Sequence, residues 1–398
     1  MRDSIDLIIK PPYLKNYTNG YPLISKAYID IGSKPIKEGT LINILDSRKN
    51  FIAKGYYGIQ NRGHGWILSH KRDEAIDERY FAQKIKEAIA YRKEFFADKN
   101  TTAFRVFNGE GDGIGGVSID YFDGYYLLTW YSEGIYSFKR EILNALEKAV
   151  EYRGIYQKRR FDTKGQYLDD KDDFIKGSTA PNPIIIKESG VNFAIYLDDG
   201  AMVGLFLDQR EVRKTIRDKY AKDKTLLNTF SYTGAFSVAG ALGGAKKTTS
   251  VDLAKRSLAK TKEQFEINSI DVSGQDIIVE DTFNYFKYAK RKNLLFDIVV
   301  LDPPSFARTK KYTFSVAKDY VKLLKDAIAI TNSGGIIVAS TNYSNFNMEK
   351  FKGFIDKAFN SLDKRYKIEE SFSLPKDFRV YEKFKESNYL KVVFIRKI

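Results

Sequence analysis

The sequence contains no cysteine and only two histidines, His64 and His70, among its 398 residues. The lack of cysteine excludes disulfide bonds, thiolate zinc sites and a cysteine nucleophile. Two histidines argue against a metal centre or a catalytic triad built on imidazole. Long apolar runs are also missing: the first is broken by Asp6 and ends at Lys10, too short for a signal peptide or a membrane span. We therefore expect a cytoplasmic protein without a metal or a membrane partner.

Acidic residues are fewer than basic residues in this chain. The chain has 66 basic and 51 acidic residues, a net charge of +15. Residues 1–95 carry 17 basic and 11 acidic side chains, residues 96–190 carry 13 and 15, and residues 191–398 carry 36 and 25. Two basic segments flanking a near-neutral one favour a polyanionic partner, most often nucleic acid. A solvated lysine-rich surface is the alternative.

The hydropathy pattern predicts two smaller domains in the first half of the chain. Residues 1–72 are expected to be all-β, a small barrel or sandwich, because short apolar runs alternate with turn residues at 46–50 and 55–65. Residues 73–195 are expected to hold a connector helix capped by Asp77 and then a small α+β domain. Within that domain, residues 169–178 are polar and are expected to form a loop.

Residues 196–398 alternate strand and helix patterns, which predicts an α/β domain of parallel βαβ units. The last two strands have no helix between them, so we expect them to pair antiparallel. Five parallel strands and a terminal antiparallel pair make the seven-stranded sheet of class I methyltransferases. The seven predicted strands are Leu226–Phe230, Thr248–Val251, Asp276–Val279, Ile298–Leu301, Gly335–Ser340, Tyr366–Leu374 and Tyr389–Arg396.

The turn after the first of these strands contains Gly234, which lets the backbone approach a cofactor. The triple glycine that seats a pyrophosphate is absent, which argues against NAD or FAD. A cofactor without phosphates, such as S-adenosylmethionine, needs only one close approach. An ordinary strand-to-helix turn is the alternative.

Carboxylates follow the second and third strands. Asp252 is placed to bind both hydroxyls of a ribose, and Asp281 to accept the adenine amino group, with Phe283 covering the ring. The alternative for each carboxylate is a helix N-cap.

The fourth strand leads directly into Asp302-Pro303-Pro304-Ser305-Phe306. Two prolines cannot continue a helix or a central ladder, so they fix a rigid backbone at the edge of the sheet. We expect Asp302 and the carbonyls of Pro303 and Pro304 to hold a methyl acceptor beside the sulfonium, with Phe306 as a stacking partner.

Residues 226–345 resemble the 23S ribosomal RNA methyltransferases of the large subunit that carry an N-terminal PUA domain. A middle segment, Gly109–Asp120, is similar to a family segment that normally has proline where this chain has Gly115. Leu45–Gly55 is similar to the PUA core. The most similar stretches are Gly204–Arg210 (GLFLDQR), Asn228–Gly234 (NTFSYTG), Ala241–Ala245 (ALGGA), Thr249–Asp252 (TSVD) and Phe296–Phe306 (FDIVVLDPPSF).

This resemblance implies a class I methyltransferase that uses S-adenosylmethionine and acts on 23S rRNA or a precursor of the large subunit, with a homodimer left open. It also implies cofactor-binding roles for residues in the matching stretches: Gln209, Asn228, Phe230, Thr233, Gly234, Asp252, Asp281, Phe283 and Asp302. Arg308, Lys310 and Lys311 are candidates for RNA phosphates, with a solvated loop as the alternative.

One departure from the family limits the chemistry. Many relatives make 5-methylcytosine, which needs a thiolate at carbon 6, and they carry cysteine in the proline motif or after the fifth strand. Here these places hold Ser305 and Ser340-Thr341-Asn342. The remaining chemistry is direct attack of a ring or exocyclic nitrogen of a base on the methyl group of the cofactor. Guanine N7 is favoured because it has a free lone pair and no proton to lose. Exocyclic amine methylation and an RNA-binding protein with an inactive methyltransferase fold are the alternatives.

Overall fold

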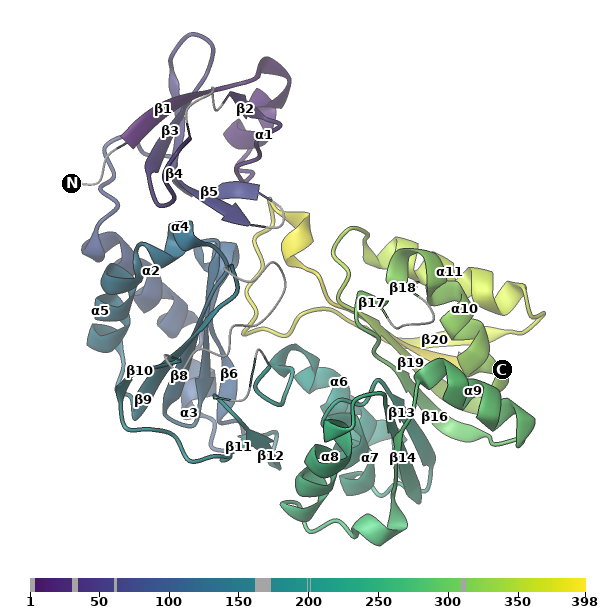
Figure 1. The fold of residues 1–398 in the computed structure, drawn as a ribbon. Helices are drawn as coiled ribbons and strands as arrows, with labels where there is room; N and C mark the ends of the chain where they lie inside the picture. The colour runs from purple at the N-terminus through teal and green to yellow at the C-terminus, as the bar shows by residue number, and fades with distance from the viewer. Residues whose placement is uncertain are drawn as a thin grey trace. The chain divides into compact units, whose positions relative to one another are not determined.

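The computed structural model describes residues 4–30, 35–60, 63–161, 173–198, 200, 202–308 and 313–398 (Figure 1). The chain forms two compact units. Unit 1 consists of Met1–Ile186, Ile195–Val203 and Lys376–Ser387; unit 2 consists of Lys187–Ala194, Gly204–Pro375 and Asn388–Ile398. The division into domains at residues 1–72, 73–195 and 196–398 stays a prediction. Within the described residues, no helix has the length and apolar character needed to cross a membrane.

The first sheet of unit 1 has five strands in the order β2-β1-β3-β4-β5. The expected β domain is present, but the segment is not all-β, because a short 3-10 turn and α1 follow β1. The prolines at the start of the 3-10 turn preset the helical backbone angle. The turn expected over 55–65 was also wrong, because β4 continues to Gln60. Gly55 serves close packing instead: a Cβ there would lie 2.3 Å from the carbonyl oxygen of Trp66. The elements are β1 (Ser4–Ile9), η1 (Pro11–Tyr13), α1 (Leu14–Thr18), β2 (Ile29–Asp30), β3 (Leu41–Leu45), β4 (Phe51–Gln60) and β5 (Gly63–Ser69).

The second sheet of unit 1 has the order β10-β9-β8-β7-β6. Asp77 caps α2 as expected, accepting from the backbone N–H groups of Arg79 and Tyr80. The loop expected at 169–178 was wrong over β10, which pairs antiparallel with β9. This edge strand is largely exposed, so it lacks an apolar signal. The elements are α2 (Glu78–Tyr91), α3 (Lys93–Ala97), β6 (Ala103–Asn108), η2 (Gly109–Asp112), β7 (Val117–Phe122), β8 (Tyr125–Trp130), α4 (Glu133–Tyr136), α5 (Lys139–Ala149), β9 (Gly154–Arg159) and β10 (Phe174–Gly177).

Gly115, where the resembling family normally has proline, packs against a ring. A Cβ at this position would lie 2.1 Å from the indole of Trp66, and the Gly115 carbonyl accepts a hydrogen bond of 2.9 Å from the Tyr56 hydroxyl. The loop therefore depends on glycine in this chain.

Unit 2 contains the predicted seven-stranded sheet, in the order β15-β14-β13-β16-β19-β21-β20 (Figure 1). Its first five strands are parallel, and β21 pairs antiparallel with both β19 and β20, as expected. The strands are β13 (Thr225–Thr229), β14 (Lys247–Asp252), β15 (Asp276–Val279), β16 (Phe296–Leu301), β19 (Thr331–Thr341), β20 (Tyr366–Phe372) and β21 (Lys391–Lys397).

Helices bury both faces of this sheet, as parallel strands require. Successive residues alternate between two cores: Leu227 and Val299 pack with side chains of α9, α10 and α11, whereas Leu226 and Ile298 pack with side chains of α6 and α7. The helices are η3 (Leu207–Gln209), α6 (Arg210–Thr215), a π-helical turn (Ile216–Tyr220), α7 (Ala235–Leu242), α8 (Arg256–Glu266), η5 (Val272–Gly274), α9 (Thr282–Arg291), α10 (Val316–Ala329) and α11 (Met348–Asn360).

Two two-stranded sheets and a short helix complete the described part of the chain. Strands β17 (Phe306–Arg308) and β18 (Thr313–Ser315) form an antiparallel pair, and β11 (Ile184–Glu188) and β12 (Val191–Ile195) form a second two-stranded sheet. The short helix η6 (Lys385–Ser387) lies in the stretch of unit 1 that connects β20 to β21.

A buried arginine ties that connecting stretch into unit 1. Arg92 forms a two-pronged ion pair with Asp112, at 3.0 and 2.7 Å, and also donates to the backbone carbonyl of Asp377. Both charged side chains are almost fully buried. Such a pair is held by its hydrogen bonds, and removal of one partner leaves an uncompensated buried charge.

We expect Arg92→Ala to destabilise unit 1 by about 3 kcal/mol, because it leaves the buried Asp112 carboxylate with only the N–H of Asn108 at 2.6 Å and the more distant Arg379 at 3.8 Å. Arg153→Ala is the matched control: the Arg153–Asp123 pair is exposed, with Arg153 63% exposed, so its loss is expected to cost at most about 1 kcal/mol. Urea unfolding, with amide hydrogen exchange reporting on unit 1, measures the change in the free energy of unfolding for each variant. Equal effects of the two substitutions would contradict this account.

Candidate functional site

The register of the parallel strands places the predicted site residues at one edge of the sheet. Thr229 at the end of β13 lies beside Val251 of β14 and Leu301 of β16, and Leu301 lies beside Ala339 of β19. The residues that follow these strands therefore lie next to one another. In open α/β sheets this carboxyl edge is where ligands bind.

The turn between β13 and α7 has an unusual backbone. Phe230, Tyr232 and Gly234 have φ angles of 54°, 51° and 78°. Left-handed angles are costly for the two aromatic residues, and such strain gathers where a fold builds a ligand site. A Cβ on Gly234 would lie 2.5 Å from Cγ2 of Thr261, so glycine is required. The turn therefore packs closely on the side chain of Thr261, and its approach to a cofactor stays a prediction.

Asp252 is fixed by the backbone of two segments. Its carboxylate accepts from the N–H of Tyr232 at 2.9 Å and from the N–H of Ala254 at 2.8 Å. The alternative of a helix N-cap was wrong, because α8 begins at Arg256 and its N-cap is Lys255. A carboxylate has about four acceptor positions, so two remain for ribose hydroxyls.

Asp281 does cap a helix, since it accepts a bond of 3.1 Å from the N–H of Asn284 at the start of α9. Capping is therefore part of the role of Asp281, and the contact of its carboxylate with adenine stays a prediction. Phe283 follows, with its ring centroid 6.3 Å from that of Phe230 and 5.7 Å from that of Phe314. The three rings form one apolar cluster.

Asp302 lies in a polar network with Gln209 and Ser340. The Gln209 amide nitrogen donates to the Asp302 carboxylate at 3.2 Å and to the Ser340 hydroxyl at 2.8 Å. Although the Asp302 residue is partly exposed, burial of its carboxyl group raises its pKa to about 6. A cation beside this carboxylate would favour its charged form.

Two buried acceptors at this edge have no hydrogen-bond partner among the described residues: Oε1 of Gln209 and Oδ1 of Asn228. An unpaired buried carbonyl oxygen is costly, so it points to a donor supplied by a ligand. The ammonium group of S-adenosylmethionine is such a donor, and its sulfonium is a cation that suits Asp302. Thr233 instead donates to the Gly204 carbonyl at 2.7 Å, which ties the turn to the preceding segment.

The proline motif forms the neighbouring part of the edge. Pro303 is buried, Pro304 and Phe306 are exposed, and the Phe306 side chain is 63% exposed. An aromatic ring open to solvent, four residues after Asp302, can stack on a base. The side chain of Arg308, and Lys310 and Lys311 altogether, lie outside what the structure describes.

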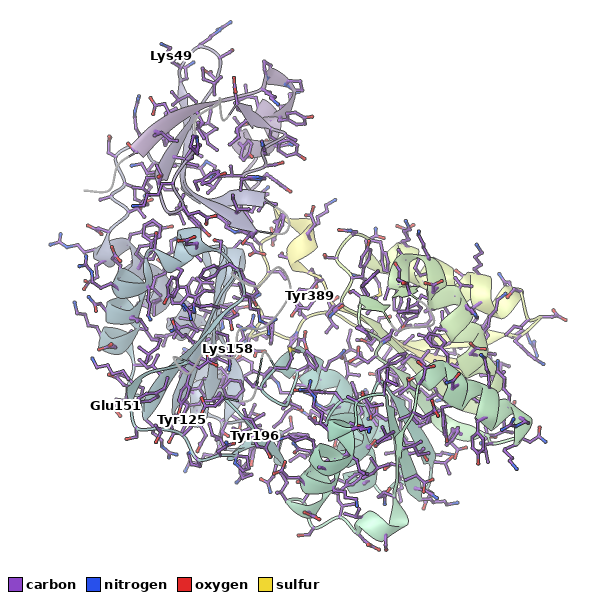
Figure 2. The ribbon with its side chains drawn as sticks, in the orientation of Figure 1. Lys49, Tyr125, Glu151, Lys158, Tyr196 and Tyr389 are labelled. Carbon is purple, nitrogen blue, oxygen red and sulfur yellow. The ribbon has the colours of Figure 1, made fainter. Side chains whose placement is uncertain are left out.

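Residues that the sequence did not single out as site residues also belong to this edge. Lys391, at the start of β21, is buried; its ammonium donates to the carbonyls of Tyr343 at 2.9 Å and Tyr389 at 2.7 Å. Burial lowers its pKa to about 8. Tyr389, labelled in Figure 2, donates to Asp208 at 2.9 Å. Because β21 is antiparallel to β19, its first residues fall at the carboxyl edge; this pairing was the available signal.

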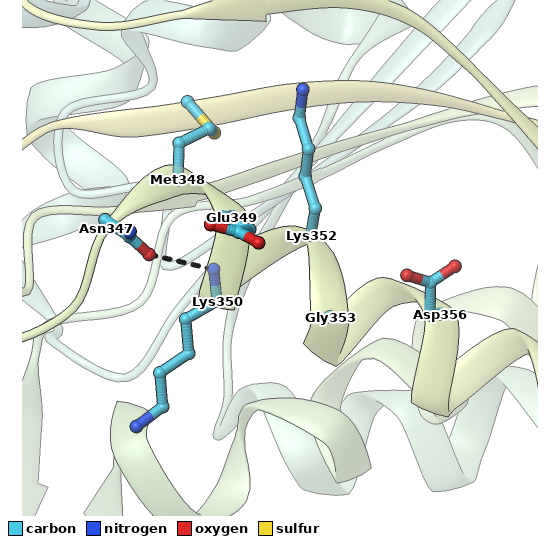
Figure 3. A pocket seen from close by; sticks show the side chains of 7 residues that line it. All are labelled: Asn347, Met348, Glu349, Lys350, Lys352, Gly353 and Asp356. Carbon is cyan, nitrogen blue, oxygen red and sulfur yellow. Dashed lines mark hydrogen bonds between the residues drawn. The ribbon is translucent and has the colours of Figure 1, made fainter.

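A surface hollow of 770 Å³ lies elsewhere, at the start of α11 (Figure 3). Asn347 caps the helix there by accepting from the N–H of Lys350. None of the predicted site residues lines this hollow, so we do not assign it to the site. Its lining residues are Asn347, Met348, Glu349, Lys350, Lys352, Gly353 and Asp356.

Comparison with known families identifies the cofactor that the protein uses. A family model described as S-adenosylmethionine-dependent methyltransferase matches residues 105–373, more than half of the chain. The chain belongs to this methyltransferase family. A model of a PUA-like domain matches residues 7–70. The expected methyltransferase fold, PUA-like N-terminal domain and S-adenosylmethionine cofactor are thus confirmed.

The similarity to individual relatives covers nearly the whole of this chain. YwbD of Bacillus subtilis strain 168, provisionally named a ribosomal RNA large subunit methyltransferase, is 57% identical over 98% of this chain and 99% of its own. Ribosomal RNA large subunit methyltransferase I of Klebsiella pneumoniae strain MGH 78578 is 28% identical over 98% of each chain. The crystal structure of SMU.776 with S-adenosylhomocysteine is 38% identical, covers 98% of this chain and all of its own, and has a TM-score of 0.91.

The turn at Gly234 gives a test of cofactor binding. Gly234→Ala adds a Cβ that clashes with Thr261, so we expect the turn to shift and the affinity for S-adenosylhomocysteine to fall at least tenfold, about 1.4 kcal/mol. Gly244→Ala is the matched control, since its φ is also left-handed but a Cβ would come no closer than 3.8 Å to a neighbour. Calorimetry on both variants measures the difference. Equal losses would mean that backbone strain, and not the clash, sets the affinity.

Asp302 gives a pH test. Its raised pKa means that the carboxyl is neutral below about pH 6 and charged above it. S-adenosylmethionine carries a sulfonium charge that S-adenosylhomocysteine lacks, so we expect the preference for S-adenosylmethionine to increase from about pH 5 to about pH 7.5. Competition binding at the two pH values measures this ratio. Asp302→Asn should remove the pH dependence; an unchanged dependence in that variant would assign it to another group.

Proposed function

We propose that this methyltransferase transfers a methyl group to N7 of a guanine in the RNA of the large ribosomal subunit. The RNA substrate is supported by relatives whose names describe ribosomal RNA large subunit methyltransferases, by the match to a PUA-like domain and by the net charge of +15. A basic surface supplies the phosphate contacts that dominate affinity for nucleic acids.

The observation that carries the choice of atom is the hydrogen bond between Ser305 and Asn342. The Ser305 hydroxyl donates to Oδ1 of Asn342 at 2.5 Å. An amide oxygen cannot take the proton of a serine, so it cannot convert Ser305 into a nucleophile. With no cysteine in the chain and both histidines in unit 1, the addition to carbon 6 that cytosine C5 methylation needs has no residue to perform it.

Guanine N7 needs positioning and no general base. Its lone pair would form the bond to the methyl carbon as the bond from that carbon to sulfur breaks, so the positive charge would pass from sulfur to the purine ring. No proton leaves. The negative charge of Asp302 would lie near both the sulfonium and the purine ring that becomes positive. The backbone at Pro303 and Pro304 would position the base, and Phe306 would stack on it. Bound S-adenosylmethionine supplies the methyl group.

The cofactor would be held by the groups already described. Asp252 would bind the ribose hydroxyls, Asp281 and Phe283 the adenine, and the free oxygens of Gln209 and Asn228 the ammonium group. Phe230, Thr233 and Gly234 would shape the turn beneath it. A role of Arg308, Lys310 and Lys311 on RNA phosphates, cytoplasmic localisation and a homodimer stay predictions.

Methylation of an exocyclic amine is the second candidate. Such enzymes commonly stack the target base on an aromatic residue directly after two prolines, and the exposed ring of Phe306 lies one position later. Here, however, Ser305 occupies the position directly after the prolines and is engaged with Asn342.

Borohydride followed by aniline separates the two candidates, because N7-methylguanine is a cation and RNA is cleaved at it. We expect 23S rRNA from cells with the enzyme to be cleaved at one guanine, and rRNA from deletion cells to remain intact there. Complementation with Asp252→Ala, which weakens the ribose contact, should restore cleavage less than the wild type does. A mark that depends on the enzyme but resists cleavage, and that has the mass of N2-methylguanine or a methylated adenine, would overturn N7 while retaining the methyltransferase.

A further inference from the structure

We infer that Asn342 selects guanine by donating an amide hydrogen bond to its O6 atom. This inference rests on the proposed N7 methylation and names the residue that reads the base. The sequence analysis named Asn342 only because relatives carry a cysteine in this segment.

Asn342 lies two residues after Ser340, which belongs to the hydrogen-bonded network around Asp302. It follows the end of β19, where Ser340 accepts from Gln209, and Gln209 also donates to Asp302. Its side chain reaches across to Ser305, three residues after Asp302. The amide of Asn342 therefore borders the place where Asp302, Pro303 and Pro304 would hold a base.

The bond from Ser305 sets which end of the amide is free. Ser305 donates to Oδ1, so the oxygen is occupied and the Nδ2 group, with two N–H donors, is left for a ligand. Asn342 is exposed, and the described part of the chain offers Nδ2 no partner. A serine that orients an asparagine in this way converts a flexible amide into a donor of fixed direction.

The backbone around Asn342 is held from three sides. Lys391 donates to the carbonyl of Tyr343, the hydroxyl of Thr341 accepts from the N–H of Tyr343 at 3.2 Å, and the hydroxyl of Tyr320 donates to the carbonyl of Ser340 at 2.7 Å. A site residue held by such contacts loses little entropy when it binds a base.

The chemistry of the purine edge explains why a donor would select guanine. Guanine presents N7 and O6 side by side, both acceptors, whereas adenine presents N7 beside an amino group that donates. An N–H group aimed at the position next to N7 bonds to guanine and opposes adenine. The same residue would orient the ring so that N7 faces the methyl group.

A double-mutant cycle tests this inference by combining Asn342→Ala in the enzyme with the removal of O6 from the target base. The target guanine, located by the cleavage assay, is replaced by 2-aminopurine, which retains N7 but lacks O6. We expect the wild type to lose about tenfold in kcat/KM on this replacement, and Asn342→Ala to be about tenfold slower on guanine but to lose nothing further on 2-aminopurine. Ser305→Ala, which frees the amide to rotate, should show a smaller loss in the same direction.

Matched controls separate this role from a change in folding. Asn342→Asp removes the donor and adds a charge that repels O6, so its loss should exceed that of Asn342→Ala; Asn345→Asp adds the same charge in the same loop and should retain activity. Affinity for S-adenosylhomocysteine should be unchanged in all variants. Equal sensitivity of wild type and Asn342→Ala to 2-aminopurine would overturn the inference. Failure of the wild type to form N7-methylguanine would instead overturn the proposed function.

Discussion

The structure of this methyltransferase depends on the in-register parallel pairing of β13, β14, β16 and β19. Backbone hydrogen bonds set which residues end each strand side by side, and the apolar residues on both faces prevent a slip by one position, since a slip would turn every buried side chain to the opposite core. Asp252, Asp302 and Ser340 lie at the same edge of the sheet because of this register. None of them needs a long loop to reach the site, so their positions are as rigid as the sheet.

Rigidity at this edge comes with electrostatic cost. Asp302 and Lys391 are charged groups with pKa values moved toward neutrality by burial, and each is surrounded by polar contacts in place of a direct ion partner. Such groups are tolerated where they serve a ligand or hold a backbone in place. The strained angles at Phe230 and Tyr232 belong to the same pattern. The sheet supplies the stability that offsets these local costs.

The sequence predicted the parts of the site that depend on order along the chain. Strand-length apolar runs located β13 to β16, and the residues directly after them, Gly234, Asp252 and Asp302, follow from that order. It did not predict Asn342 or Lys391 as site residues, because their roles depend on partners more than 35 residues away across the sheet. Similarly, α1 and β10 were missed because one is very short and the other is an exposed edge strand whose neighbour supplies the hydrogen bonds.

The path of the chain between the two units has a consequence for biosynthesis. Lys376–Ser387 is an integral part of unit 1, held by Arg92 through the carbonyl of Asp377, yet it is encoded between the last two strands of unit 2. As the ribosome releases the chain from its N-terminus, the buried charges of Arg92 and Asp112 emerge long before this segment does. Unit 1 therefore reaches its final form only after residues 204–375 of unit 2 have been synthesised, and a nascent chain that stops before residue 376 leaves both units unfinished together.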